Sequence, residues 1–337
     1  MKRVTKHGRR SAVPRSPGDG FGPASVQFFL TVTQISGLLV LPRASTLWPS
    51  TSEVLRVRTN NLAAVRTETQ RTVVAAEIDF LLPGVDRPFT YGREAPQGGE
   101  PETARFASHA VQIADVRHGD GLALDEHGAQ LGWWPTRVRR FYDESHVQRR
   151  YYPECSDIIK AALGADQVVV FDHNVRRGSE LQLGARAHNI GRPVHHAHTD
   201  YTPRSALRRL QQELGPEAEK GLSRYLQINL WRPIRGPLRD APLAICDGAT
   251  VSPQSLRTVE LRYADRTGEI YYLMHDPGQR WYFASDMTVD EAWLLKNFDS
   301  APPGPGHVAP HSAFADPRPQ YLPPRESIEV RALAIFH

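Results

Sequence analysis

The chain has 337 residues, of which 40% are hydrophobic and 23% charged, a balance typical of a chain that buries a core as one large domain or two modest ones. Its net charge of +4 and isoelectric point near 9.1 reflect basic residues concentrated in residues 1–72, which gives no evidence for a nucleic-acid-binding face. The two cysteines, Cys155 and Cys246, are too few for a disulfide framework or a cysteine metal site, and we expect free thiols in a reducing, cytoplasmic compartment.

Residues 1–72 differ in composition from the rest of the chain. Residues 1–22 are basic and rich in Pro and Gly, 26–41 are apolar without charge, and 50–72 are polar again. The apolar stretch is shorter than the roughly 20 residues that span a bilayer, and it contains Thr, Gln and Ser. We therefore predict a poorly ordered or mis-started basic extension, with a targeting segment and a membrane element as the alternatives.

Residues 73–337 are predicted to form one folded domain. Its first part mixes helices with strands, and its second part consists of short strands separated by Pro and Gly turns. The predicted strands are 73–80, 110–122, 167–171, 225–231, 243–247, 258–262, 269–274, 281–284, 293–298 and 328–336. The predicted helices lie within 144–162 and over 205–213, with 215–222 as a continuation of the second, and 89–98 is predicted to be a loop. This order is typical of a mainly β protein with flanking helices, a double-stranded β-helix or jelly roll of the cupin kind.

The most informative short motif is His198-Thr199-Asp200. Alternate side chains of a strand lie on one face, so His198 and Asp200 would point the same way. A histidine and a carboxylate are two of the three ligands in the facial triad that holds non-haem Fe(II), which leaves positions open for a co-substrate and O₂. His196 shares that face, and Tyr201 follows Asp200 directly. We expect both of them to lie near the substrate, and His196 has the alternative role of a hydrogen-bond donor that supports the metal ligands.

The third metal ligand must be a distant histidine that folding brings close. His311, in the segment Pro310-His311-Ser312, is the predicted ligand because an arginine–serine motif follows it in the chain. The alternative is His275, which stands at the end of a predicted strand just before a turn.

Residues 325–336 predict a strand with two unlike faces. One face is apolar and should pack against an outer layer, whereas the other begins with Arg325, Ser327, Glu329 and Arg331. An arginine fork matches a carboxylate with two hydrogen bonds, and a buried arginine without a partner would be very costly. The pattern therefore indicates a bound dicarboxylate such as 2-oxoglutarate, held by Arg325 and Ser327, with Arg331 as the other candidate anchor. The alternatives are an Arg–Glu pair within the strand and an exposed edge.

Asn229 and Trp231 share one face of the predicted strand 225–231. We assign them to the substrate pocket, with an ordinary structural strand as the alternative.

Several short motifs together resemble those of a known family. They are, in chain order, YYPE (151–154), VFDHNVR (170–176), HTDY (198–201), NLWRP (229–233), PLAICD (242–247), FDS (298–300), PHSAF (310–314) and RESIEVR (325–331). Their order resembles the hydroxylase/desaturase family, which includes an aspergillic-acid-pathway desaturase, gibberellin desaturase-like proteins and the cephamycin 7α-methoxylation protein. The resemblance covers about residues 73–337. It implies a double-stranded β-helix and Fe(II)/2-oxoglutarate chemistry in secondary metabolism.

We therefore expect a non-haem Fe(II)/2-oxoglutarate-dependent dioxygenase that uses O₂ to hydroxylate or desaturate an unactivated C–H bond of a small molecule. Two other classes remain open on the residues alone: a zinc hydrolase with the same His/Asp/His set, and a non-catalytic β-barrel that binds a small ligand. We expect no nucleic-acid partner and no membrane anchor, and the sequence does not set an oligomeric state.

Overall fold

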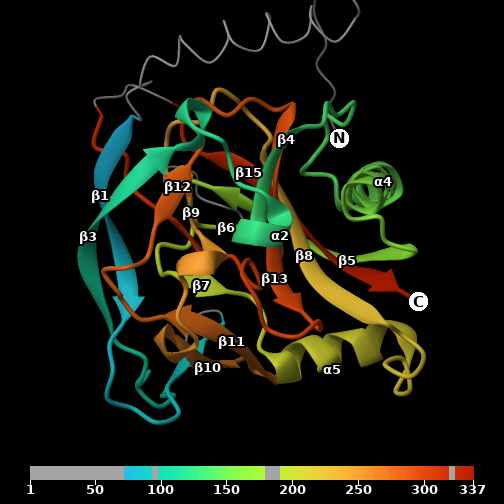
Figure 1. Cartoon of the computed structure of the whole chain (residues 1–337), viewed down its shortest axis with the longest axis horizontal. Coiled ribbons are helices and arrows are strands. Elements are labelled where there is room, and N and C mark those ends of the chain that lie inside the picture. The colour runs from blue at the N-terminus through green and yellow to red at the C-terminus, as the bar shows by residue number, and fades with distance from the viewer. Residues whose placement is uncertain (1–71, 93–97, 179–189, 319–322) are drawn as a thin grey trace, which may run out of the picture. The chain divides into compact units, whose positions relative to one another are not determined.

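A computed structural model describes residues 72–92, 98–178, 190–318 and 323–337, so residues 1–71 of the predicted extension lie outside the described residues. Two curved, mainly antiparallel sheets form the body of the described chain (Figure 1). The larger sheet holds, in spatial order, β1 (Val73–Leu81), β3 (Phe106–Asp115), β12 (Trp281–Phe283), β9 (Leu243–Cys246), β14 (His311–Ala313), β7 (His198–Thr199), β11 (Thr267–Leu273), β10 (Leu256–Arg262) and β2 (Phe89–Tyr91). The smaller sheet holds β4 (Ala129–Trp133), β13 (Glu291–Asp299), β8 (Arg224–Pro233), β15 (Glu326–Phe336), β5 (Gln167–Arg177) and β6 (Ile190–Gly191). The predicted strand-rich class is confirmed.

Apolar side chains from both sheets meet between them. Ile245 of β9 belongs to the same buried cluster as Trp231 of β8 and Trp293 of β13. Burying side chains of this size from both sheets removes a large apolar area from water, and each is worth roughly 1.5–3 kcal/mol. This cluster therefore fixes the separation of the two sheets beside the polar site described below.

Helix α4 (Tyr152–Leu163) covers the outer face of the smaller sheet (Figure 1). Short turns at α3 (Glu144–His146) and Val147–Tyr151 lead into it, and Gly164 ends it in the left-handed conformation, φ 64°, with its N–H bonded to the Lys160 carbonyl. Its buried Cys155 and Ile159 pack in one cluster with the apolar face of β15. The predicted helix and the predicted outward face of the last strand therefore meet each other.

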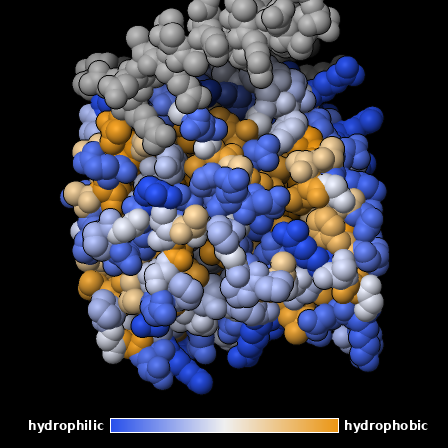
Figure 2. Space-filling view, in the orientation of Figure 1, coloured by the Kyte–Doolittle hydropathy of each residue, from blue (hydrophilic) through white to orange (hydrophobic). Residues whose placement is uncertain are grey.

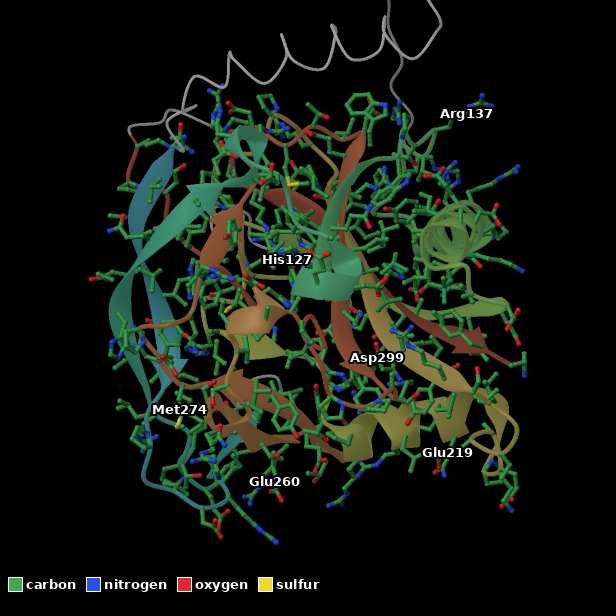
Figure 3. The ribbon with its side chains drawn as sticks, viewed as in Figure 1. His127, Arg137, Glu219, Glu260, Met274 and Asp299 are labelled. Carbon is green, nitrogen blue, oxygen red and sulfur yellow. The ribbon has the colours of Figure 1, made fainter. Side chains whose placement is uncertain are left out.

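Helix α5 (Pro203–Leu214) starts three residues after Asp200. Thr202 and Ser205 form a reciprocal capping box at its N-terminus. Ala206 and Leu210 pack against the ends of β8, β13 and β15. Figure 3 labels Asp299 at the end of β13, near this helix, and Glu219 in the turn beyond it. The capped and packed helix therefore holds the backbone just after Asp200 in place.

Several predicted boundaries were wrong. Residues 215–222 are turns instead of helix, because Gly215 has φ 100°, which no helix continues through. The strand predicted over 110–122 ends at Asp115, whose carboxylate caps a short 3₁₀ turn over Val116–His118. Residues 89–91 form a strand where a loop was expected, and β5 runs six residues beyond its predicted end.

The remaining short elements connect these layers. They are α2 (Leu124–His127) and the 3₁₀ turns Gly248–Thr250 and Pro253–Ser255. The face drawn in Figure 2 is largely hydrophilic with interspersed apolar patches. The large apolar side chains that are exposed among the described residues are Val73, Leu82, Val85, Trp133, Tyr142 and Leu214. No helix among the described residues is long and apolar enough to cross a membrane.

Candidate active site

Two short strands bring the predicted metal ligands together. His311 of β14 is the direct register partner of His198 of β7, so their side chains are neighbours in the sheet. One potential ligand atom from each of His198, Asp200 and His311 lies within 4.8 Å of the others. The Nε2 atom of His198 is 3.6 Å from Oδ1 of Asp200, and the two imidazole centroids are 4.6 Å apart. This cluster is the only such group of three found among the described residues.

Both histidines are oriented by the same kind of hydrogen bond. Nδ1 of His198 lies 2.7 Å from the His196 carbonyl, and Nδ1 of His311 lies 3.1 Å from the Ala309 carbonyl. Because a carbonyl only accepts, each Nδ1 carries the proton and donates it. A neutral ring with this hydrogen bond carries its free lone pair on Nε2, the nitrogen that binds a metal ion.

Asp200 is held by groups on its other oxygen. Its Oδ2 accepts a hydrogen bond from Asn229 Nδ2 at 2.9 Å and lies 3.4 Å from Arg331 Nε. Its backbone N–H donates to Asn297 Oδ1 at 2.9 Å, and Thr199 donates to the same oxygen. Oδ1 is therefore the oxygen that stays available toward the two histidines.

The charges of the cluster match its geometry. Burial would raise the pKa of Asp200, but Arg331, His198 and His311 outweigh burial and hold that pKa below its usual value. Burial and the neighbouring His311 lower the pKa of His198 to about 3. At neutral pH the cluster therefore presents a carboxylate and a neutral imidazole, the protonation states that a metal ion needs.

Arg325 is buried, with 3% of its surface exposed, and no carboxylate among the described residues lies in ion-pair distance of it. Its Nε donates to Ser327 Oγ at 2.9 Å and its Nη1 to the Ala241 carbonyl at 2.8 Å, while its guanidinium lies over the Trp231 ring at 4.9 Å. Burial and the nearby Arg176 cation lower the pKa of Arg325 to about 9, so it is still a cation at neutral pH. Within the described part of the chain, Arg325 is therefore a fixed positive charge without a counter-ion.

Arg331 is in the opposite situation. It lies 3.0 Å from Asp172 and 3.4 Å from both Asp200 and Glu329. Burial would lower the pKa of Arg331, but these carboxylates raise it above its ordinary value. Its guanidinium is already surrounded by anions of the chain itself.

Two adjoining cavities meet at the cluster. The larger, of about 380 Å³, is lined by His198, Asp200, Tyr201 and Arg331, by polar residues of α5 and β11, and by Leu261 of β10. The narrower one is lined by His311, Trp231 and Arg325, and shares His198 and Asp200 with the first. A ligand beside the metal ligands would thus have Arg325 at one end and the larger cavity at the other.

The remaining sequence candidates fall in different places. Asn229 contacts Asp200 and lines neither cavity. The ring of His196 stacks on Phe106 at 3.8 Å and lies 3.8 Å from Asp79, so only its backbone carbonyl serves the site. The period-two pattern did not place the His196 side chain beside His198, because the backbone at residue 196 bridges to Asp79 of β1, whereas β7 pairs with β11 and β14. His275 stacks on His109 and is not part of the cluster.

Sequence reasoning missed Asn297, and it gave no site role to Asp172 and Arg176, which it noted only within the motif VFDHNVR (170–176). Asp172 and Arg176 lie on β5 at alternate positions with Asn174, a spacing that places all three on one face of the strand. The polar stretch after the apolar residues 168–171 was the available signal, but it does not alternate, because His173 between these residues and Arg177 after them are also polar.

Comparisons with known proteins agree with this geometry. A family model described as "Oxidoreductase/YMDC permease-like domain" matches residues 78–335. The hydroxylase/desaturase efuI of Hormonema carpetanum is 33% identical over 289 residues, covering 75% of this chain and 96% of that protein. The Fe(II)/2-oxoglutarate-dependent dioxygenase nvfI of Aspergillus novofumigatus is 32% identical over 277 residues, covering 78% and 97%. A solved structure of the iron and alpha-ketoglutarate-dependent endoperoxidase NvfI superposes with a TM-score of 0.71 at 28% identity, covering 79% of this chain and 99% of that one.

Proposed function

Since the chain belongs to the family of hydroxylase/desaturases and Fe(II)/2-oxoglutarate-dependent dioxygenases, we propose that it hydroxylates or desaturates an unactivated C–H bond of a small molecule in secondary metabolism. Its cofactor and co-substrates are Fe(II), 2-oxoglutarate and O₂. The observation that carries the proposal is the cluster of His198, Asp200 and His311 beside a buried arginine that has no counter-ion among the described residues.

The donor set fits a ferrous ion. Two imidazoles and one carboxylate, with ligand atoms within 4.8 Å of one another, would form the facial triad that holds non-haem Fe(II) and leaves positions open for a co-substrate and O₂. Fe(II) bound there, together with 2-oxoglutarate and O₂, supplies the oxidising power for breaking a C–H bond.

The residues around the triad position its ligands. The His196 and Ala309 carbonyls fix the two imidazole tautomers, and Asn229 and Arg331 fix the rotamer of Asp200. Groups of this kind raise ligand basicity and hold the ring orientation, and their loss costs about 10–100-fold in metal affinity.

Arg325 and Ser327 fit the far carboxylate of 2-oxoglutarate. The guanidinium has five N–H donors, of which Nε and one on Nη1 are used within the chain, so the remaining three are free for a carboxylate. Arg331 is a weaker candidate for this anchor because three carboxylates already surround it. We therefore assign the anchor to Arg325 and the positioning of Asp200 to Arg331.

The substrate pocket is proposed to be the larger cavity. Tyr201 lines it, whereas Trp231 lines the narrower cavity beneath Arg325. We propose that His196 and Asn229 act on the metal ligands and do not touch the substrate.

We also propose that residues 73–337 carry the activity and that the protein acts in the cytoplasm. The family match over 78–335 supports the first assignment, and the free, buried Cys155 and Cys246 support a reducing compartment.

The deciding experiment incubates anaerobically purified protein with Fe(II), labelled 2-oxoglutarate and O₂, and measures succinate with and without a pool of candidate metabolites. Conversion that requires Fe(II) supports the proposal. A zinc hydrolase or a non-catalytic binding barrel would consume no 2-oxoglutarate. If no succinate forms under any of these conditions, the oxygenase assignment is refuted. Mass spectrometry of the product separates hydroxylation, a gain of one oxygen atom, from desaturation, a loss of two hydrogen atoms.

A further inference from the structure

Arg176 is a second arginine of the site, and none of the roles above uses it. It lies on β5 directly opposite Ser327 of β15. Residues directly opposite each other in an antiparallel pair present their side chains on the same face, so Arg176 shares the face of Ser327 and Arg325. It lines both the narrow cavity with Arg325 and the larger cavity.

The described residues use little of the hydrogen-bonding capacity and charge of the Arg176 guanidinium. Within the described part of the chain, its one hydrogen bond runs from Nη1 to the Arg192 carbonyl at 3.3 Å, and it makes no ion pair. The charge of Glu329 is felt at Arg176, but the ion pair of Glu329 is with Arg331. Burial lowers the pKa of Arg176, as expected for a cation withdrawn from water. Several of its five N–H donors therefore remain for a ligand.

The backbone beside Arg176 is shaped around it. Gly191 of β6 pairs with Arg176, and a Cβ at position 191 would lie 2.5 Å from Arg176 Nη1. Any side chain there would displace the guanidinium from its present position. Because Nη1 is the end of a flexible side chain, such a displacement moves the charge without breaking the sheet.

From these contacts we infer that Arg176 is a second carboxylate-binding residue of the site, distinct from the Arg325 anchor. A carboxylate is the ligand that a planar guanidinium recognises with two parallel hydrogen bonds. That carboxylate belongs either to 2-oxoglutarate in the narrow cavity or to the small-molecule substrate in the larger one. The inference rests on the proposed function for the identity of the co-substrate. That the bound group is a carboxylate rests on the structure alone.

Three variants separate direct binding from a general effect of charge. Arg176→Gln removes the guanidinium, and Gly191→Ala displaces it while keeping its charge. Arg177→Gln is the matched control, because the adjacent residue on β5 loses the same charge but lies over the Tyr142 ring and lines neither cavity. Circular dichroism and melting temperature establish that each variant is folded.

The first measurement is calorimetric titration of 2-oxoglutarate into Mn(II)-loaded full-length protein. If Arg176 binds the co-substrate, Arg176→Gln weakens 2-oxoglutarate binding about tenfold or more, Gly191→Ala weakens it by a smaller factor, and Arg177→Gln changes it less than about twofold.

The second measurement compares benzoate with benzamide, both with the Mn(II)- and 2-oxoglutarate-saturated protein and with the metal-free protein. If Arg176 binds a substrate carboxylate, wild type prefers benzoate, and Arg176→Gln and Gly191→Ala lose that preference while their 2-oxoglutarate binding is unchanged.

Unchanged 2-oxoglutarate affinity and unchanged benzoate selectivity in a folded Arg176→Gln protein would overturn the inference, as would equal losses in Arg177→Gln. If Arg176→Gln does not fold, the same two criteria apply to Gly191→Ala. Failure of wild type to bind Mn(II) or 2-oxoglutarate would instead refute the proposed function, and the benzoate comparison on metal-free protein would then decide the inference by itself.

Discussion

Replacing Arg325 with Met tests the anchor most directly. Methionine keeps apolar contact with the Trp231 ring but removes the buried charge and all five donors. Two of those donors bind Ser327 and the Ala241 carbonyl, so a carboxylate would take two of the remaining three. Hydrogen bonds to charged groups contribute about 1.5–3 kcal/mol each, so the variant should lose about 3–6 kcal/mol of 2-oxoglutarate binding.

This loss corresponds to a rise of about 10²–10⁴-fold in the dissociation constant for 2-oxoglutarate, since about 1.4 kcal/mol is tenfold. The assay is calorimetric titration into Mn(II)-loaded protein, repeated with 2-oxobutyrate, which lacks the far carboxylate. Wild type should strongly prefer 2-oxoglutarate, whereas the Arg325→Met variant should bind the two acids with similar affinity. Iron content should stay nearly unchanged because Arg325 contacts none of the three metal ligands.

Arg325→Lys is the informative control. Lysine keeps a positive charge but not the planar fork, so we expect an intermediate affinity. Equal affinity for 2-oxoglutarate in wild type and in a folded Arg325→Met protein would refute the reasoning, and it would return the anchor to Arg331.

Three further predictions concern the metal centre and acid stability. His311→Ala should lose bound iron and turnover together, whereas His275→Ala should retain both; metal analysis and succinate release check this, and full activity in His311→Ala would exclude it as a ligand. Asn229→Ala should lower Fe(II) affinity about 10–100-fold without abolishing binding, measured by competition with a chelator, and an unchanged affinity would show that Asp200 needs no such support. Burial lowers the pKa of His173, whose Nδ1 lies 2.8 Å from the Tyr152 hydroxyl, so below about pH 6.5 the unfolded state binds a proton that the native state does not, and stability falls as the pH drops. His173→Gln should flatten the dependence of melting temperature on pH between about 5 and 7, and an unchanged slope would assign that dependence to other groups.

The sequence predicted the parts of the fold that have a clear period. Helix α4 and strand β15 show one apolar face each, and these faces pack on each other in the structure. The pattern failed where a strand lines the site. The second half of β5 is polar because Asp172, Asn174 and Arg176 lie on the face toward the site. A search for strands by their apolar buried face therefore ended the predicted strand at residue 171.

The candidate site was predictable only as a list of residue types. The pair His198 and Asp200 followed from strand alternation, and the structure brings His311 to them through the register of β14 on β7. Nothing local in the sequence separates Arg325 from Arg331, because both lie on the same face of one strand. The difference between them comes from Asp172 on the neighbouring strand, which is a tertiary contact that no periodicity reports.

The pairing of β7 with β14 has a consequence for how the protein assembles. Each strand is only two or three residues long, and the single register pair between them joins segments that lie far apart in the chain. Closing so long a loop costs conformational entropy, and the few hydrogen bonds between β7 and β14 offset little of that cost. The β7–β14 pairing, called the seam below, should therefore be among the last contacts to form and the first to open. A bound divalent ion would clamp both sides of the seam, and amide protons of β7 and β14 should then exchange with solvent more slowly than in the ion-free chain.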